Sequence, residues 1–395
     1  MGRFLFVVPP LSGHVNPTIA LGEELSRRGH AVAWTGHSQL VAPLLPTGAE
    51  LIPLDHELPA EMVTSARERA MSLRGVAALE FLWREFLRPL AVAMVPGVEA
   101  AVTAFEPDCL VVDQQAFAGA IVARRRGIAW VTSATTSAEL VDPFHALPKV
   151  GAWVLSQLVE LQLEAGVTGE VATRGDLRFS DHLIIAFTTS ALTGPLTLPE
   201  GSGPVVMVGP SLRGADREGV DASLAHFLDR PGPGVLVTLG TVNAEAGGRF
   251  FAAALEAAEH SSWRAVVVAP AETIVDPPEN VFVARFVPQL QVLDRVDAVV
   301  CHAGHNTVCE SLAKGLPLVV APIRDDQPII ADQVEKCGAG VRVRFGRVGP
   351  KELKAAVDAV LDDGDYRAAA ARVQASFVSA GGAAAAADNL EELVR

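Results

Sequence analysis

The feature that most limits the fold is the regular alternation of short β-rich runs with helical segments in the first half of the chain. Runs rich in Val, Leu, Ile and Phe recur between residues 3 and 188, and the segments between them carry apolar residues at helical spacing. Strands are expected at residues 3–9, 31–35, 50–53, 109–113, 128–133 and 182–188. The first helix is expected at residues 17–28, with Asn16 as its N-cap. Because parallel strands need crossover helices, this alternation predicts a doubly wound α/β domain.

The alternation stops near residues 208–214, which are rich in Gly, Pro and charge, and starts again at Gly234. The second series of strands is expected at residues 235–239, 264–269, 281–284, 298–302 and 317–321. A chain of 395 residues that is 50% hydrophobic can fill two cores. We therefore predict two facing Rossmann-like α/β domains, residues 1–209 and 210–380, with a deep cleft between them.

Charge and composition argue against several classes of protein. The net charge is −14, from 32 basic and 46 acidic residues, whereas a nucleic-acid surface needs clustered Lys and Arg. The most apolar stretch, residues 90–105, is shorter than the roughly 20 residues of a membrane span and contains Glu99. Four scattered cysteines fit a reducing compartment better than a disulfide scaffold. We expect no nucleic-acid partner, no stable membrane insertion and a cytoplasmic location.

One segment of the second half is typical of a phosphate site. An apolar run at residues 297–300 leads into His302, Gly304, Asn306 and Thr307 at the start of an expected helix. The first turn of a helix presents backbone N–H groups without intrahelical acceptors, and the helix dipole places positive charge there. We therefore expect this segment to hold a diphosphate.

This segment and three others resemble the signature of the inverting UGT-type glycosyltransferases of the GT-B fold, a family that includes bacterial macrolide and antibiotic glycosyltransferases. The matching blocks are Phe286-Val-Pro288-Gln289, His302-x-Gly304-x-Asn306-Thr307-x-x-Glu310, Asp326-Gln327 and, in the first half, Gly13-His14-Val15-Asn16-Pro17. The likeness covers essentially the whole chain. It implies that residues 1–209 bind the acceptor, that residues 210–380 bind the nucleotide sugar, and that residues 381–395 form a helix crossing back onto the first domain.

The resemblance implies a role for each matched residue in binding the donor. Phe286 would stack on the nucleobase, Gln289 would lie near the base edge, and Glu310 would accept hydrogen bonds from the ribose hydroxyls. Asp326 and Gln327 would hold hydroxyls of the sugar, as suits carboxylate and amide groups.

The resemblance also implies that two loops contact the phosphates. His302 would face the diphosphate. The residues implied to bind its oxygens are Gly304, Asn306 and Thr307. Gly240 and Thr241 follow the first strand of the second domain and fit a further loop beside the phosphates. No metal is expected, because the blocks predicted to bind the donor contain no Asp-x-Asp motif and helix N-termini can neutralise a leaving diphosphate.

Inverting transfer to a hydroxyl needs a base that takes the acceptor proton, and histidine titrates in the right range. His14 follows the first predicted strand and Asp113 ends another, so both belong to the carboxyl edge of the same sheet. A carboxylate bonded to one ring nitrogen would fix the tautomer and stabilise the imidazolium. We predict His14 as the general base and Asp113 as its partner.

Two long helical stretches, residues 66–105 and 149–165, interrupt the alternation of the first domain. The aromatic residues assigned to an acceptor pocket are Trp83, Phe86, Phe117, Phe144 and Trp153. Helical insertions often wall a pocket, but aromatic side chains at helical spacing more often fill a core. Both interpretations remain open at the level of the sequence.

We therefore expect a hexosyltransferase that moves a sugar from a nucleotide diphosphate to a hydroxyl of a small apolar natural product, as in antibiotic biosynthesis. Glu310 favours a UDP-sugar over a TDP-deoxysugar, because many deoxysugar transferases lack an acid there. His305 and Ile330 depart from residues common in the family, which leaves the recognition of the sugar undefined. A GT-B nucleotide-sugar epimerase and a non-catalytic auxiliary homologue are the alternatives, and the presence of His14 disfavours both.

Overall fold

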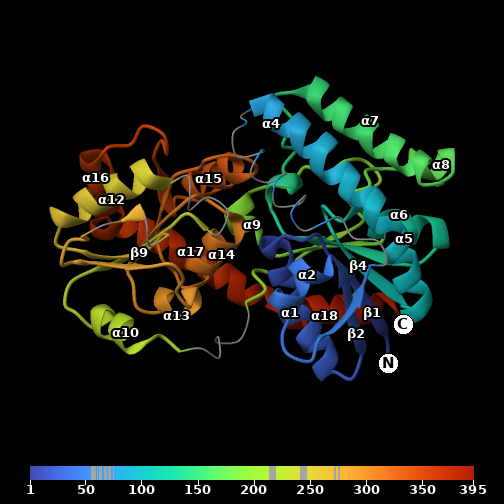
Figure 1. Ribbon diagram of the computed structural model, residues 1–395, viewed down its shortest axis with the longest axis horizontal. Helices are drawn as coiled ribbons and strands as arrows, with labels where there is room; N and C mark the ends of the chain where they lie inside the picture. The colour runs from blue at the N-terminus through green and yellow to red at the C-terminus, as the bar shows by residue number, and fades with distance from the viewer. Residues whose placement is uncertain are drawn as a thin grey trace. The chain divides into compact units, whose positions relative to one another are not determined.

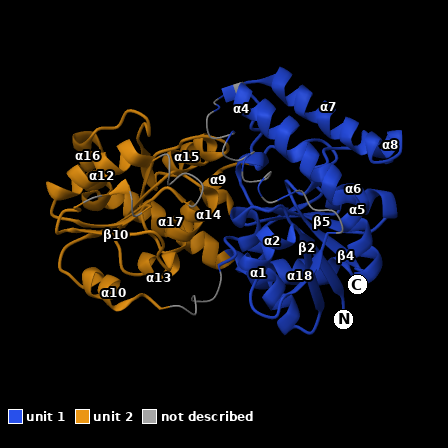
Figure 2. Ribbon diagram, in the orientation of Figure 1, with its two compact units in different colours: residues 1–187, 196–213, 380–395 blue, residues 188–195, 214–379 orange. Residues whose placement is uncertain are grey.

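The structure is a computed structural model that describes residues 1–54, 59, 61, 65, 69, 73, 75–212, 219–240, 247–270, 273–274 and 276–395. The chain forms two compact units (Figure 2). Unit 1 comprises Met1–Phe187, Leu196–Arg213 and Ala380–Arg395, and unit 2 comprises Thr188–Pro195 and Gly214–Ser379. The predicted boundary at residue 209 leaves Thr188–Pro195 in the first domain. This segment belongs instead to unit 2, where the hydroxyl of Ser376 donates to that of Thr189 at 2.8 Å.

Unit 1 is built on a parallel sheet of seven strands in the order β3-β2-β1-β4-β5-β6-β7 (Figure 1). The strands are β1 (Arg3–Val7), β2 (Ala31–Gly36), β3 (Glu50–Pro53), β4 (Cys109–Asp113), β5 (Trp130–Ala134), β6 (Leu183–Ala186) and β7 (Val205–Met207). Successive side chains of β1 point to opposite faces, so Phe4 and Phe6 join one hydrophobic cluster while Leu5 and Val7 join another. β7 lies outside the predicted strands, because its 3 residues are too few to show a period.

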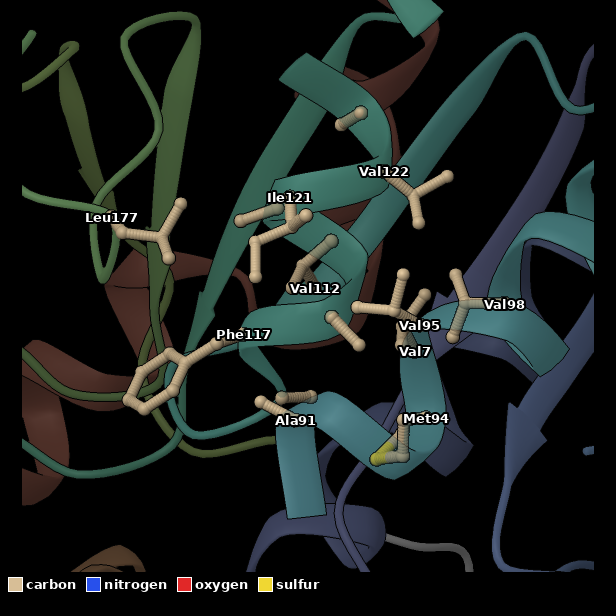
Figure 3. Close-up of a cluster of buried hydrophobic side chains, with 14 of the residues drawn as sticks. Val7, Ala91, Met94, Val95, Val98, Val112, Phe117, Ile121, Val122 and Leu177 are labelled. Atoms are coloured by element: carbon tan, nitrogen blue, oxygen red, sulfur yellow. The ribbon is translucent and has the colours of Figure 1, made fainter. Parts of the chain in front are cut away.

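Helices cover both faces of this sheet. Those of unit 1 are α1 (Ser12–Arg27), α2 (Ser38–Val41), η1 (Ala42–Leu44), α4 (Gly75–Phe81), η2 (Leu82–Leu87), α5 (Arg88–Phe105), α6 (Phe117–Arg126), η3 (Ala138–Leu140), α7 (Pro148–Glu164), α8 (Gly169–Ala172) and α18 (Gly382–Leu393). α1 and α18 share a hydrophobic cluster with Phe4 and Phe6. α5 and α6 pack on the opposite face, where Met94 and Phe117 lie in one cluster with Val112 of β4 (Figure 3).

The helical region that ends at Phe105 starts as α4, passes through the π-helical turn η2 and continues as α5. Its predicted start at residue 66 lies outside the described residues. By length and composition alone, Ala77–Phe105 is apolar enough to cross a membrane, contrary to the expectation from the sequence. However, 56% of its apolar window is buried inside the structure, and Arg88 pairs with Glu160 and Glu164 of α7. These contacts are those of a core helix in a folded domain.

The C-terminal helix α18 is fixed on α1 of unit 1. Leu390 is fully buried in the cluster that contains Phe4 and Phe6. Arg28, which follows α1, pairs with Asp388 at 2.6 Å, and the imidazole of His30 lies 2.9 Å from a carboxylate oxygen of Glu391. Apolar burial and these partly exposed ion pairs act together, and the burial contributes most of the stabilisation.

Unit 2 contains a second parallel sheet, in the order β10-β9-β8-β11-β12-β13 (Figure 1). Its strands are β8 (Gly234–Thr238), β9 (Arg264–Val268), β10 (Val281–Ala284), β11 (Ala298–Cys301), β12 (Leu318–Val320) and β13 (Gly340–Arg342). Its helices are α9 (Ser190–Thr193), α10 (Ala222–Leu228), α12 (Gly248–Glu259), α13 (Gln289–Leu293), α14 (His305–Ala313), α15 (Gln327–Lys336), α16 (Pro350–Asp362) and α17 (Gly364–Ala380). Phe250 and Phe251 of α12 pack with Val357 of α16 in its core. β13, a strand of 3 residues, is again absent from the prediction.

Candidate active site

His14 lies in the first turn of α1, shortly after β1. The sequence predicted that this helix begins at Pro17 with Asn16 as its N-cap. The helix instead begins at Ser12, because the backbone N–H groups of His14 and Val15 already bond to the carbonyl of Leu11 at 2.9 and 3.0 Å. The strand order of unit 1 reverses between β1 and β4, so His14 lies at a topological switch point, where α/β folds bind ligands.

The imidazole of His14 is hydrogen-bonded to the carboxylate of Asp113, the last residue of β4. Nδ1 of the ring lies 2.9 Å from Oδ1 and 3.0 Å from Oδ2. The Asp113 side chain is 0% exposed and that of His14 is 16% exposed. The backbone N–H of Gln115 also donates to Oδ1, at 2.8 Å. Because a carboxylate accepts hydrogen bonds, this contact favours the tautomer that carries the proton on Nδ1.

Thr135, which the sequence analysis missed, belongs to the same cluster. Its hydroxyl donates to Oδ2 of Asp113 at 2.8 Å and lies 2.9 Å from Nδ1 of His14. Thr135 directly follows β5, the strand next to β4 in the sheet. The signal available in the sequence was the Ser- and Thr-rich run at residues 132–136. Only the order and register of the strands show which hydroxyl of that run meets Asp113.

In unit 2 the strand order reverses between β8 and β11, and the loops after these strands contain Gly240 and His302. The imidazole of His302 lies between two glycines. A Cβ atom on Gly240 would come within 2.7 Å of Cε1 of this ring, and one on Gly304 would come within 2.4 Å of Nε2. Both positions therefore require glycine, and Gly240 also has a φ of +69°. Thr241, predicted beside Gly240, lies outside the described residues.

His302 is an uncharged residue near neutral pH. Burial lowers the pKa of its imidazole to about 4, although the nearby carboxylate of Asp326 acts in the opposite direction. Its Nδ1 is buried and has no hydrogen-bond partner within the described part of the chain. Positive potential at this place therefore comes from the backbone at the start of α14 and from the nearby guanidinium of Arg324, which also lowers the pKa of the imidazole, rather than from His302.

We expect His302 to make the stability of unit 2 depend on pH. An unfolded histidine has a pKa of about 6.5, and the folded His302 has a pKa of about 4, so the unfolded chain binds the proton first. The stabilisation from the neutral ring is complete above about pH 6.5 and is lost as the pH falls toward 4. From pH 7 to pH 5 this loss amounts to about 2 kcal/mol. Denaturant unfolding should show a smaller loss for His302→Gln than for the wild type, and equal losses would contradict the assignment.

α14 begins at His305, three residues after His302, and its N-terminus lies beside the His302 ring. Gly304 is its N-cap, and Ala303 before it has a φ of +64°, a left-handed conformation that residues with side chains rarely adopt. The backbone N–H of Val308 bonds to the carbonyl of Gly304 at 3.0 Å, which closes the first turn. Asn306 is half-buried and Thr307 is buried in this turn. The N-terminus of such a helix attracts an anion.

The predicted nucleotide side of the site combines an exposed ring with a polar pair. Phe286, in the loop after β10, is 71% exposed, so its ring face is available to a flat ligand. Gln289 begins α13, and its side-chain amide donates to Oε2 of Glu310 on α14 at 2.5 Å. The amide thus orients the carboxylate predicted to accept from the ribose.

Gln327 organises the loop that follows β12. Its Oε1 accepts hydrogen bonds from the backbone N–H groups of Ile323 at 2.9 Å and Arg324 at 3.2 Å. Asp326 is the N-cap of α15 and lies close enough to His302 to raise the pKa of that imidazole. The loops after β8, β11 and β12 therefore meet at the carboxyl edge of one sheet, and they bring together the residues predicted to bind phosphate and sugar.

His305 and Ile330, which depart from the family pattern, are both buried. His305 begins α14 with Sγ of Cys309 3.5 Å from its Nε2, and Ile330 on α15 is 0% exposed. Ile330 thus faces the interior of unit 2. Among the described residues, no group of three or more His, Cys, Asp or Glu side chains could hold a metal ion.

The aromatic residues assigned to an acceptor pocket lie in or on the core of unit 1. Trp83, Phe86 and Phe117 are buried, and Trp83 stacks on Phe117 with ring centroids 5.4 Å apart. Phe144 and Trp153 are partly buried and pack against the same core. The first three residues belong to the core cluster, because their helices turn them toward other apolar side chains.

Known proteins resemble this chain along its whole length. Residues 264–393 match the family described as Erythromycin biosynthesis protein CIII-like, C-terminal domain. The chain is 30% identical to demethyllactenocin mycarosyltransferase of Streptomyces fradiae, with 100% of this chain and 87% of that protein covered. It is 29% identical to 4'-demethylrebeccamycin synthase of Lentzea aerocolonigenes, with 99% of each covered. The solved structure of the glycotransferase of kitacinnamycin matches with a TM-score of 0.79 and 25% identity, over 100% of this chain and 99% of that one.

Fold, site and relatives together define the class: the protein is a glycosyltransferase with two parallel-sheet α/β units of the GT-B type. Within that class, the chain belongs to the family 1 natural-product glycosyltransferases, which include the macrolide and antibiotic enzymes.

Proposed function

We propose that this glycosyltransferase moves a hexose from a nucleotide diphosphate sugar to a hydroxyl of a small apolar natural product, with inversion at the anomeric carbon. The hydrogen bond between Nδ1 of His14 and Asp113 carries the proposal, because it assigns the basic lone pair of the ring to Nε2. The cysteines of the described residues form no disulfide, which supports action in the cytoplasm.

In the proposed reaction, the acceptor oxygen attacks the anomeric carbon while Nε2 of His14 takes its proton. The bond between the anomeric carbon and the diphosphate breaks, and the leaving diphosphate carries away the electron pair. Asp113 stabilises the imidazolium that forms. The N-terminus of α14 meets the charge of the diphosphate without a metal ion, as Gly304 and the first turn of the helix suggest.

We propose UDP-sugars as the preferred donors because of Glu310. The ribose of UDP carries two hydroxyls, whereas the deoxyribose of a thymidine nucleotide lacks the 2′-hydroxyl. A carboxylate held by the amide of Gln289 can accept from both hydroxyls of the ribose. A hydrogen bond to a charged acceptor contributes about 1.5–3 kcal/mol, which corresponds to a preference of at least tenfold.

Product formation from UDP-glucose and TDP-glucose with a panel of hydroxylated polycyclic acceptors tests this proposal. We expect transfer from both donors, at least about tenfold higher kcat/KM with UDP-glucose, and product of the opposite anomeric configuration to the donor. Glu310→Gln should remove most of the preference while transfer from TDP-glucose stays within a few-fold of the wild type. Retained configuration would refute inversion, and an unchanged preference in the variant would refute the role of Glu310. Absence of transfer with every pair would count against the proposed reaction.

A further inference from the structure

The hydroxyl of Thr135 touches both members of the predicted catalytic pair. It lies 2.8 Å from Oδ2 of Asp113 and 2.9 Å from Nδ1 of His14, although Asp113 is 99 and Thr135 is 121 positions from His14 along the chain. We infer that Thr135 is a positioning residue, which holds His14 in the tautomer and orientation of a general base. The inference rests on the proposed function of His14.

The direction of the hydrogen bonds follows from counting protons. Thr135 has one hydroxyl proton and donates it to Oδ2 of Asp113. Its oxygen then presents a lone pair to Nδ1 of His14. The carboxylate oxygens, at 2.9 and 3.0 Å, are acceptors as well. Three acceptor atoms thus surround Nδ1, which favours a proton on this nitrogen, shared among them, and disfavours a lone pair there.

Burial makes the hydroxyl difficult to replace. Thr135 is 3% exposed and the side chain of Asp113 is 0% exposed. If the hydroxyl is removed, the space it leaves is closed to bulk solvent, and Oδ2 of Asp113 loses a donor inside the protein. The carboxylate is then held by fewer contacts. It can rotate more freely, and the ring of His14 is held less firmly in one orientation. Thr135 acts through these two residues and needs no contact with the substrates.

The effect of losing Thr135 should therefore depend on how much the acceptor needs a base. An alcohol keeps its proton at neutral pH and needs His14, whereas an acidic phenol ionises without help. A residue that merely supports the fold would affect both acceptors equally. This difference separates a positioning role from a structural one.

Thr135→Val keeps the shape of the side chain and removes its hydroxyl, while Thr135→Ser keeps the hydroxyl. The matched control is Thr35→Val, because Thr35 on β2 is fully buried in the same unit and its hydroxyl has no hydrogen-bond partner among the described residues. His14→Ala is measured in parallel. Each variant is assayed with UDP-glucose and with an alcohol and a nitrophenol built on one ring system, after its fold is checked by circular dichroism. Thr135→Ala is used if the valine variant does not fold.

We expect Thr135→Val to lower kcat roughly tenfold with the alcohol and less than about twofold with the nitrophenol, at an unchanged KM for the donor. Thr135→Ser and Thr35→Val should stay near the wild type. The role of Thr135 would be overturned if His14→Ala abolishes transfer to the alcohol while Thr135→Val lowers kcat equally with the two acceptors, or does not lower kcat with the alcohol. If His14→Ala itself retains that transfer, the proposed base is wrong, and the inference fails with it.

Discussion

Replacement of His14 by alanine is expected to lower kcat/KM for an alcohol acceptor by about 10²- to 10⁴-fold, the range that a positioned general base contributes. The imidazole is held by Asp113 at 2.9 Å, and alanine offers no group that could take the acceptor proton. Binding of the donor should not change, because the donor contacts proposed here lie on other residues. Initial rates with the alcohol and thermal shifts with UDP-sugar measure the two quantities separately.

His182→Ala is the matched control for this experiment. His182 also lies beside a carboxylate, at 3.1 Å from Asp181, but its side chain is 41% exposed and it precedes β6, at the amino edge of the sheet. Its loss should leave transfer within about twofold of the wild type, as expected for an exposed pair. Near-normal transfer by His14→Ala to the alcohol, with donor binding intact, would show that another group is the base.

Gly304→Ala is expected to raise the KM for the donor by roughly 10- to 100-fold. The new Cβ would lie 2.4 Å from Nε2 of His302, closer than real Cβ contacts allow. The ring has little freedom to retreat, because it is buried and Gly240 also packs close to its Cε1 atom. Overpacking of this kind costs about 1–3 kcal/mol, and here it displaces the imidazole and the first turn of α14 together. Donor titration should show the higher KM, and denaturant unfolding should show the loss of stability.

Gly349→Ala tests whether the higher donor KM of Gly304→Ala comes from the contact with His302 rather than from replacing any N-cap glycine. Gly349 is also a helix N-cap, at the start of α16, and a Cβ on it would meet no atom within 4 Å. The variant should keep the KM of the wild type and should lose about 0.5–1 kcal/mol of stability, because alanine is a poorer N-cap than glycine. A normal donor KM in Gly304→Ala would mean that His302 and α14 do not depend on the close approach at Gly304.

Periodicity predicted the long and regular elements well. β2, β4 and α7 follow their predicted ranges closely, because each is bounded by Gly, Pro, charged or turn-forming residues. Periodicity failed at the three-residue edge strands β7 and β13, which are only partly buried, whereas β12, equally short, lies in a fully buried apolar run and was predicted. It also misplaced the start of α1, since Pro17, a residue typical of a first turn, here lies inside a helix that begins at Ser12.

The residues of the site were visible in the sequence to different degrees. His14, Asp113, His302 and Gly304 each end a strand or begin a helix, where parallel sheets collect functional groups, so their position pointed to chemistry. The aromatic residues of the helical insertion carried no such signal. Trp83 and Phe117 have the spacing of core residues, and the structure stacks them in the core.

By itself the sequence determined which residue types stand at the carboxyl ends of the strands, because β-runs and turn residues are local properties of the chain. Only the tertiary structure decided which of them meet. The neighbouring order of β1, β4 and β5 brings His14, Asp113 and Thr135 together, with Asp113 in register with Ser133 two residues before Thr135. The hydroxyl of Thr135 gained its role from that register, because a hydrogen bond depends on distances of about 3 Å that no local pattern specifies.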